Sequence, residues 1–149
     1  MYKLYIKTNI SSNKLLDIVL KENNIKNYKI YYNKYGKPYL NLDKYFNISN
    51  TDNITVCVFS DKEIGVDIEK LKYNELVMKR MFNKKEIDLV NKSLNKKEIF
   101  TIIWTIKESY SKLLGLGLNY KFKNIDSFNL KNKISIKKYQ NYIVTIIEE

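Results

Sequence analysis

The segment from residue 96 to residue 114 constrains the fold more than any other part of the chain. Apolar side chains recur in it at intervals of three and four residues, at Ile99, Ile102, Ile103, Ile106, Tyr110, Leu113 and Leu114. This spacing follows the turn of an α-helix, and Gly115 comes directly after it as the residue type that commonly ends one. We therefore predict a long helix over residues 96–114 with one apolar stripe.

Segments on both sides of this helix predict further strands and helices. Apolar runs and alternations indicate strands over residues 2–7, 28–32, 45–49, 54–59, 64–68, 133–139 and 142–147. Helical spacing indicates helices after Ser11 or Ser12, over 73–82 and over 84–94. Residues 60–63 form a polar turn, so we expect strands 54–59 and 64–68 to make a hairpin. The mixed order of elements favours an α+β architecture over a doubly wound parallel sheet.

The length of 149 residues predicts one folded unit spanning the chain, although two small subdomains sharing an interface would also fit. The single cysteine, Cys57, cannot form an internal disulfide and indicates a reducing compartment. The N-terminal residues alternate polar and apolar instead of forming the core of a signal peptide. No segment approaches the roughly 20 apolar residues of a membrane span. We expect a soluble, cytoplasmic protein.

The formal net charge of +11 indicates an anionic partner. The basic residues are 26 Lys and one Arg, scattered along the chain beside many Asn, Ile and Tyr residues. These residue types share A+T-rich codons, so a compositional drift of the genome explains much of the excess. The charge alone therefore leaves nucleic acid, a phosphorylated cofactor and an acidic protein as possible partners.

Three acidic residues in two short segments are the candidates for chemistry in a chain without histidine. Asp67 and Glu69 follow each other at the strand period, so their carboxylates would project from one face about 6–7 Å apart. Glu108 lies opposite the apolar stripe of the long helix, one turn before Lys112. On spacing alone, a solvated strand end and an exposed Glu–Lys pair are the more ordinary explanation of these residues. Trp104, one turn before Glu108, instead indicates that this helix face is partly covered, by substrate or by the other half of the protein.

If the three carboxylates meet, their oxygen donors favour Mg²⁺ before Mn²⁺ or Ca²⁺. A zinc site is disfavoured, because the chain has no histidine and one cysteine. A magnesium ion held in this way can bind phosphate oxygens and neutralise charge on a pyrophosphate during transfer. Lys107 and Lys112 would add positive charge there.

The segments 65–70 and 104–112, in this order and at this spacing, resemble the paired signatures of the 4′-phosphopantetheinyl transferases. Segments 36–39, 46–49 and 80–86 look like secondary family segments, so the resemblance covers roughly residues 36 to 118. The 66 residues before Asp67 resemble the longer, monomeric, surfactin-synthetase-activating class. That class implies two similar α+β halves with the active site between them, here residues 1–62 and 63–149.

The resemblance implies a Mg²⁺-dependent enzyme that moves the 4′-phosphopantetheine arm of coenzyme A onto a serine of an acyl or peptidyl carrier protein. The other product would be adenosine 3′,5′-bisphosphate. By this resemblance Asp67, Glu69 and Glu108 bind the metal. Glu108, or a water bound to the metal, would act as the base for the carrier serine, and Lys112 would assist catalysis.

The resemblance also implies a set of coenzyme A contacts. Lys107 and Lys112 would lie near the pyrophosphate, and Lys37, Ser49 and Asn50 near the other phosphates. Asn50 stands where the family usually has histidine. A neutral amide donates a hydrogen bond but carries no charge, so the expected contact with the 3′-phosphate is weaker.

Two other functions remain open at this point. A small basic nucleic-acid-binding module would use tyrosines for stacking and lysines for phosphates, but it leaves both acidic segments unexplained. A pseudoenzyme that binds a carrier protein without transferring anything would account for Asn50 and for a first half that is unusually short for the two-half class.

Overall fold

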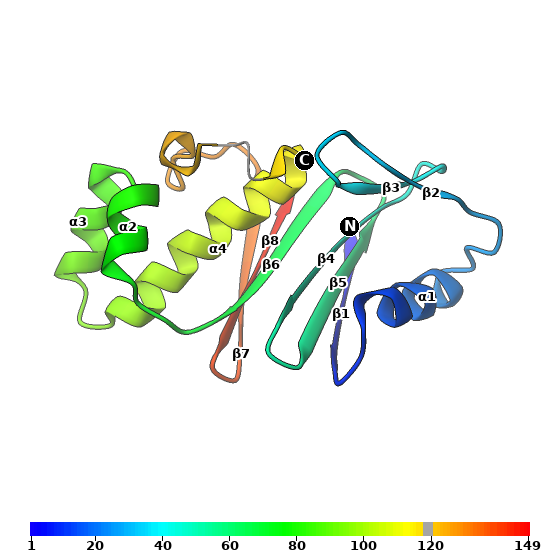
Figure 1. The fold of residues 1–149 in the computed structure, drawn as a ribbon, viewed down its shortest axis with the longest axis horizontal. Helices are drawn as coiled ribbons and strands as arrows, with labels where there is room; N and C mark the ends of the chain where they lie inside the picture. Colours follow the sequence, from blue (N-terminus) through cyan, green and yellow to red (C-terminus); the bar gives the residue numbers. More distant parts are fainter. Residues whose placement is uncertain (118–120) are drawn as a thin grey trace.

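A computed structural model describes residues 1–117 and 121–149 (Figure 1); residue 118, the last in the stretch resembling the transferases, lies outside them. The strands are β1 (Tyr2–Thr8), β2 (Ile30–Tyr32), β3 (Pro38–Leu40), β4 (Tyr45–Thr51), β5 (Ile54–Ser60), β6 (Ile64–Lys70), β7 (Lys133–Tyr139) and β8 (Tyr142–Glu148). The helices are α1 (Ser12–Glu22), α2 (Glu75–Met81), α3 (Lys84–Lys92), α4 (Lys96–Leu114) and the 3₁₀-helix η2 (Phe122–Asn124). The predicted α+β architecture is confirmed.

Two halves of the described chain repeat one topology. In the first sheet β1 and β4 each pair antiparallel with β5, and in the second β6 and β7 each pair antiparallel with β8. Each half therefore runs strand, helix, strand, strand, with the last strand in the centre of its sheet. The expectation of two similar α+β halves is confirmed, and their boundary after residue 62 stays a prediction.

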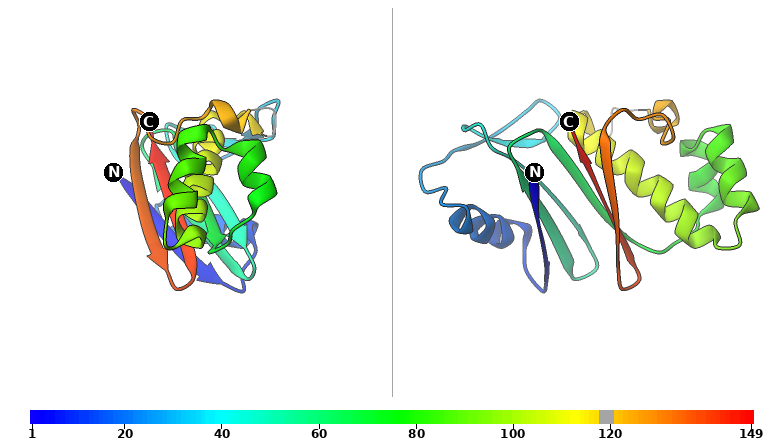
Figure 2. Two further views of the ribbon diagram at one scale, coloured as in Figure 1. Left: turned by 90° about the vertical axis from the view of Figure 1, so that its left-hand side faces the viewer. Right: turned by 180° about the vertical axis from the view of Figure 1, so that it is seen from behind.

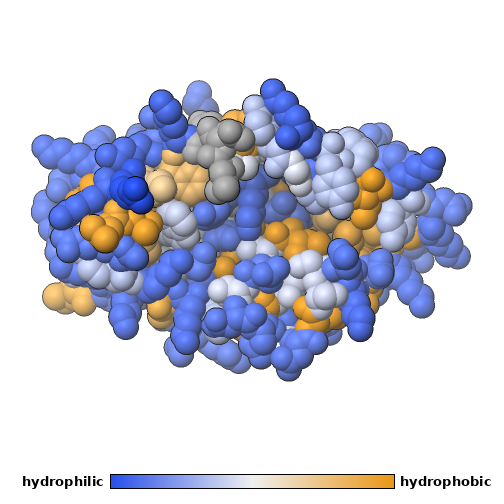
Figure 3. Space-filling model, viewed as in Figure 1, coloured by the Kyte–Doolittle hydropathy of each residue, from blue (hydrophilic) through white to orange (hydrophobic). Residues whose placement is uncertain are grey.

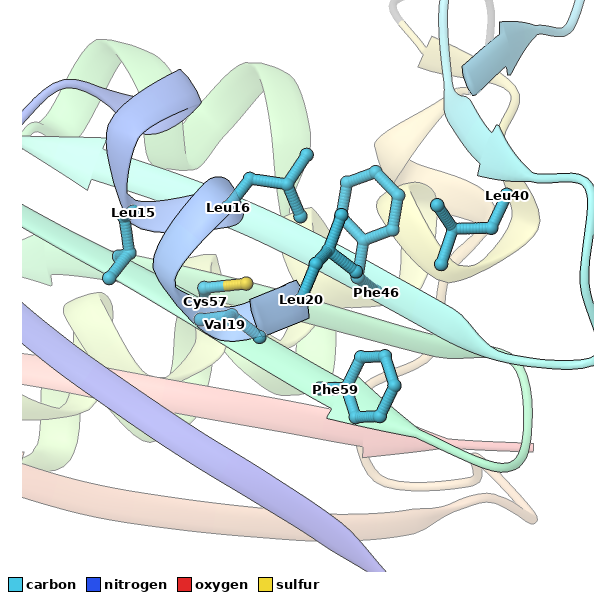
Figure 4. Packing of buried hydrophobic residues seen from close by; sticks show 8 residues of the cluster. All are labelled: Leu15, Leu16, Val19, Leu20, Leu40, Phe46, Cys57 and Phe59. Atoms are coloured by element: carbon cyan, nitrogen blue, oxygen red, sulfur yellow. The ribbon is translucent and has the colours of Figure 1, made fainter. Parts of the chain in front are cut away.

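The sheets pack against each other through aliphatic side chains, and a helix covers each outer face (Figures 1 and 2). The core between the sheets comes from β5, β6 and β8, with Ile54, Val56, Val58, Ile64, Val66, Ile68, Val144 and Ile146. On the outer side of the first sheet, α1 places Leu15, Leu16, Val19 and Leu20 against Phe46, Cys57 and Phe59 (Figure 4). Helix α4 covers the second sheet with Ile106 and Leu113. Across the described ranges, no helix has the length and apolar character of a membrane span.

The halves are joined by side-chain hydrogen bonds between β4 and the free edge of β6. The backbone N–H of Val66 donates to Asn47 Oδ1 over 2.9 Å, and that of Ile68 donates to Ser49 Oγ over 3.4 Å. From the first pair to the second, the residue number rises by two in β6 and by two in β4. The two strands therefore run in the same direction along this seam. The seam places a polar edge of the first half beside Asp67.

The expected hairpin between residues 54–59 and 64–68 is wrong. Strand β5 is already paired on both edges, with β1 and β4, so it has no edge left for β6. The polar residues 61–63 instead carry the chain from one sheet to the other. The true hairpin joins β4 to β5, and the short strand β3 was not anticipated from the sequence.

Helix α4 comes closest to its sheet at Gly65. A Cβ atom added there would collide with the carbonyl oxygen of Ser109 and lie 2.7 Å from the backbone nitrogen of Leu113. Only a residue without a side chain allows the helix backbone to rest on β6 in this way. The contact fixes the height of Glu108 and Lys112 above the strand that carries Asp67.

We predict that Gly65→Ala lowers the free energy of unfolding by roughly 3 kcal/mol, because the collision is with backbone atoms that cannot rotate away. Urea unfolding followed by circular dichroism measures the change. Lys70→Ala, at an exposed position on the same strand, is the control and should stay within about 0.5 kcal/mol of the wild type. Equal stabilities for Gly65→Ala and the wild type would show that α4 does not rest on β6 as described.

Candidate active site

The acidic pair on β6 faces α4, as the strand period predicts. Val66 and Ile68 belong to the core between the sheets, so Asp67 and Glu69 project to the opposite side, toward the helix. Glu108 and Lys112 lie one turn apart on that helix. The structure therefore brings the two acidic segments to one place in the fold.

Asp67 is buried, with 4% of its surface exposed. Its Oδ1 accepts hydrogen bonds from Ser49 Oγ and from Lys112 Nζ, each over 2.9 Å. Its Oδ2 is also buried and has no hydrogen-bond partner among the described residues. Burial raises the pKa of Asp67, while the Lys112 charge opposes the rise. The spare buried oxygen is suited to a cation or to a donor from a ligand.

Glu69 is held by a lysine and by the only tryptophan of the chain. Lys72 Nζ lies 3.0 Å from one carboxylate oxygen, and Trp104 Nε1 donates to the other over 3.3 Å. The ammonium of Lys72 also lies 5.6 Å from the centre of an indole that packs on the ring of Phe122. The Trp104 face of the helix is therefore covered, as predicted, but by Lys72 and Phe122 of its own half instead of by the other half.

Glu108 has a pKa raised to about 7, first by burial and then by the negative charges of Asp67 and Glu69. Lys112 and Lys72 offset part of this rise. The effect of these two charges on Glu108 indicates that the three carboxylates lie near one another. Within residues 1–117 and 121–149, however, no group of three or more Asp, Glu, His or Cys side chains is arranged so that it could hold a metal ion as it stands.

A cavity of about 280 Å³ opens beside Glu108 and Lys112. The first half lines it with residues 35–38 and with Asn47, and the second half adds Phe122. On the face drawn in Figure 3 the surface is hollowed near the middle, with hydrophilic side chains in its depth. A concave site with polar groups at one wall is the usual form of a small-molecule site.

Lys37 borders this cavity, but its ammonium is turned into the protein. Nζ lies 2.7 Å from Glu63 Oε2 and donates over 2.8 Å to the carbonyl of Leu113 in the last turn of α4. A cation at the C-terminus of a helix stabilises its unpaired carbonyls. The Lys37 ammonium is therefore bound to Glu63 and to the end of α4, in place of the expected phosphate.

Lys107 is not brought to the site. Its side chain is fully buried, with Nζ 2.8 Å from Glu86 Oε1, 2.8 Å from the carbonyl of Phe122 and 2.6 Å from the carbonyl of Ile125. It directly precedes Glu108, and one residue turns a helix by about 100°, so adjacent residues face different neighbours. The structure does not support the expected contact between Lys107 and a pyrophosphate.

Ser49 and Asn50 lie on opposite sides of β4. Ser49 faces Asp67, and its hydroxyl is occupied by that carboxylate. Asn50 is exposed and donates to Ser12 Oγ over 3.1 Å. Their expected phosphate contacts stay predictions, and the structure assigns Ser49 the separate task of holding Asp67.

Two further residues of the site were missed from the sequence. Lys72 follows the acidic strand in a loop, and Phe122 follows the long helix, so no periodic pattern marks either one. The only available signal was Trp104, whose exposed position on a predicted helix required a covering group. That signal gives the presence of a cover but not its identity.

Comparisons with known proteins agree on one family. The model of the 4′-phosphopantetheinyl transferase superfamily matches residues 63–146. The chain is 36% identical over 123 residues to 4′-phosphopantetheinyl transferase gsp of Aneurinibacillus migulanus, covering 78% of this chain and 51% of that protein. It is 38% identical over 103 residues to 4′-phosphopantetheinyl transferase Sfp of Bacillus subtilis (strain 168), covering 66% of this chain and 45% of that protein.

The chain thus spans about half the length of these relatives. Among solved structures, holo-[acyl-carrier-protein] synthase of Thermotoga maritima aligns with a TM-score of 0.47 and 20% identity. That alignment covers 57% of this chain and 61% of the other.

We predict that Glu108 makes the protein less stable as the pH rises from about 4.5 to about 7. Because its pKa is raised in the folded state, the native protein keeps a proton that the unfolded chain has lost in this window. Glu108→Gln lacks this titration. In chelator-containing buffer, its free energy of unfolding should therefore exceed that of the wild type by an amount that grows with pH, to the order of 2–3 kcal/mol by pH 8.

Urea unfolding at a series of pH values measures the effect. Glu75→Gln, at an exposed position on α2, serves as the control and should follow the wild-type profile. Parallel profiles for Glu108→Gln and the wild type over the whole range would contradict a raised pKa at this position.

Proposed function

This chain belongs to the 4′-phosphopantetheinyl transferase superfamily, and from that premise we propose that it transfers the 4′-phosphopantetheine group of coenzyme A to a serine of an acyl or peptidyl carrier protein. The products would be the holo-carrier protein and adenosine 3′,5′-bisphosphate. One observation carries the proposal: the segment that matches the family places Asp67, Glu69 and Glu108 on facing elements, beside a cavity lined by both halves.

We assign Asp67, Glu69 and Glu108 as the ligands of a magnesium ion, with manganese as the alternative. The residues fit such an ion in their chemistry, because all donors are carboxylate oxygens and one buried oxygen of Asp67 lacks a partner among the described residues. Burial raises the pKa of Glu108 first, and the repulsion from Asp67 and Glu69 that adds to the rise would be relieved by a cation. When bound, the ion would neutralise charge on the pyrophosphate of coenzyme A.

Lys112 is the lysine that we assign to the pyrophosphate. Its side chain keeps 29% of its surface exposed and lines the cavity while its ammonium contacts Asp67. It can therefore meet a phosphate oxygen without leaving the site. Lys37 and Lys107 have no comparable freedom, because both are bound inside the protein.

Glu108 is the group that we assign as the base. The hydroxyl oxygen of the carrier serine attacks the phosphorus that bears the pantetheine arm, and the bond from that phosphorus to the leaving adenosine bisphosphate breaks. The serine proton passes to the Glu108 carboxylate. Glu108 lines the cavity, so it stands at the wall of the space that a serine hydroxyl would enter.

The charge of the chain supports the same partners. Coenzyme A is a multiply charged anion, and a net charge of +11 would speed its encounter with this protein and that of an acidic carrier protein. We propose that the chain works as a monomer, because residues of both halves line one cavity within a single chain.

We predict that Asp67→Asn and Glu108→Gln lower the rate of transfer by about a hundredfold or more, because each removes a charge at the site of reaction. Incubating the protein with an apo carrier protein, coenzyme A and Mg²⁺, and following the carrier by mass spectrometry, measures the addition of one phosphopantetheine. Glu75→Gln is the matched control and should transfer at the wild-type rate.

Three outcomes would contradict the proposal. Near-normal transfer by either site variant would remove that residue from the chemistry. Carrier binding without any mass gain in the wild type, with several carriers tried, would favour a carrier-binding pseudoenzyme. Tight, salt-sensitive binding to single-stranded DNA without transfer would favour the nucleic-acid module.

A further inference from the structure

A buried ion pair beside the site has no role in the chemistry proposed above. Lys107 on α4 and Glu86 on α3 are both fully buried, with Nζ and Oε1 2.8 Å apart. Burial lowers the pKa of Lys107, and the Glu86 carboxylate opposes that change. A buried pair of this kind is a poor source of stability compared with apolar packing, so its partners deserve a functional explanation.

Every donor of the Lys107 ammonium is used within the protein. The carbonyls of Phe122 and Ile125 accept its other two hydrogen bonds, over 2.8 and 2.6 Å. An ammonium group has three donors, and these two carbonyls and Glu86 take all of them. The residue therefore acts on the backbone of residues 122–125 instead of on a ligand.

Glu86 holds the same segment from the other side. Its Oε2 accepts hydrogen bonds from both the backbone N–H and the hydroxyl of Ser127. Its Oε1 also accepts from the backbone N–H of Asn83, in the capping box at the start of α3. The ion pair thus fastens residues 122–127, which we call the anchor segment, to two helices (Figure 1, orange).

The anchor segment in turn shapes the candidate site. The ring of Phe122 lines the cavity beside Glu108 and packs on the indole of Trp104, with ring centres 5.4 Å apart. Trp104 donates to Glu69. A continuous set of contacts therefore leads from Lys107 through Phe122 and Trp104 to an acidic residue of the site.

We propose that Lys107 is a positioning residue which, paired with Glu86, anchors residues 122–127 so that Phe122 closes one wall of the cavity and Trp104 keeps Glu69 in place. Lys107 itself touches neither substrate nor metal. The kinetic part of this inference rests on the proposed transferase function, and its structural part does not.

The test uses a double variant, Glu86→Leu with Lys107→Met, which removes both charges together and leaves neither one buried alone. Trp104 is the only tryptophan in the chain, so its emission wavelength and its quenching by acrylamide report on the Phe122 contact. Phosphopantetheine transfer gives kcat and the KM for coenzyme A. If the double variant does not fold, Ser127→Ala takes its place in the same measurements, because it removes one hydrogen bond to Glu86 and leaves the ion pair intact.

The matched control is Leu20→Ala, in the separate core under α1. This substitution lowers the free energy of unfolding by leaving a cavity in a core that does not include the anchor segment. It therefore shows what a general loss of stability does to emission and kcat. We expect the double variant to show red-shifted, more readily quenched emission and a roughly tenfold to hundredfold loss of kcat. The Leu20→Ala protein should keep the wild-type emission and kcat.

Unchanged emission and turnover in the folded double variant would overturn the inference. So would a raised KM for coenzyme A with unchanged emission, because that pattern indicates a direct phosphate contact by Lys107. If the wild type transfers nothing but the emission still depends on Glu86 and Lys107, the anchoring is supported and the proposed function fails. The two failures are therefore distinguishable.

Discussion

The contact between α4 and β6 at Gly65 sets the geometry on which the rest of the candidate site depends. The helix backbone touches the strand there at Ser109 and Leu113, so the residues directly before them, Glu108 and Lys112, are held at a fixed height above it. A larger residue would lift α4 and separate Glu108 and Lys112 from Asp67. Two acidic segments forty residues apart in the chain meet because Gly65, at the start of the first segment, has no side chain.

Local patterns predicted the elements well but not their pairing. The intervals in residues 96–114 gave the long helix, and the alternation around Asp67 correctly placed Val66 and Ile68 in a core. The expected hairpin between β5 and β6 failed because a strand's partners depend on which edges are already filled. The edges of β5 are filled by β1 and β4, which lie earlier in the chain, so the residues around β5 and β6 do not reveal the pairing.

The partners of the lysine side chains could not be predicted from the sequence. Lys37, Lys107 and Lys112 all occur near motifs, and their charge alone fits a phosphate site. The structure separates them by what their ammonium groups touch: Glu63 and a helix end, Glu86 and two carbonyls, and Asp67 beside the cavity. Such partners come from distant segments, so no local pattern distinguishes a structural lysine from an available one.

The seam between β4 and β6 makes the alignment of the two halves depend on two side chains. Each sheet is held by a regular backbone ladder, but Asn47 and Ser49 bridge the sheets with single side-chain hydrogen bonds. Along this line the strands meet through side chains in place of a backbone ladder, so the register between β4 and β6 depends on which residues stand at positions 47 and 49. Ser49 also donates to Asp67, so a substitution at this one position would disturb both the register of the seam and the setting of the most buried carboxylate of the cluster.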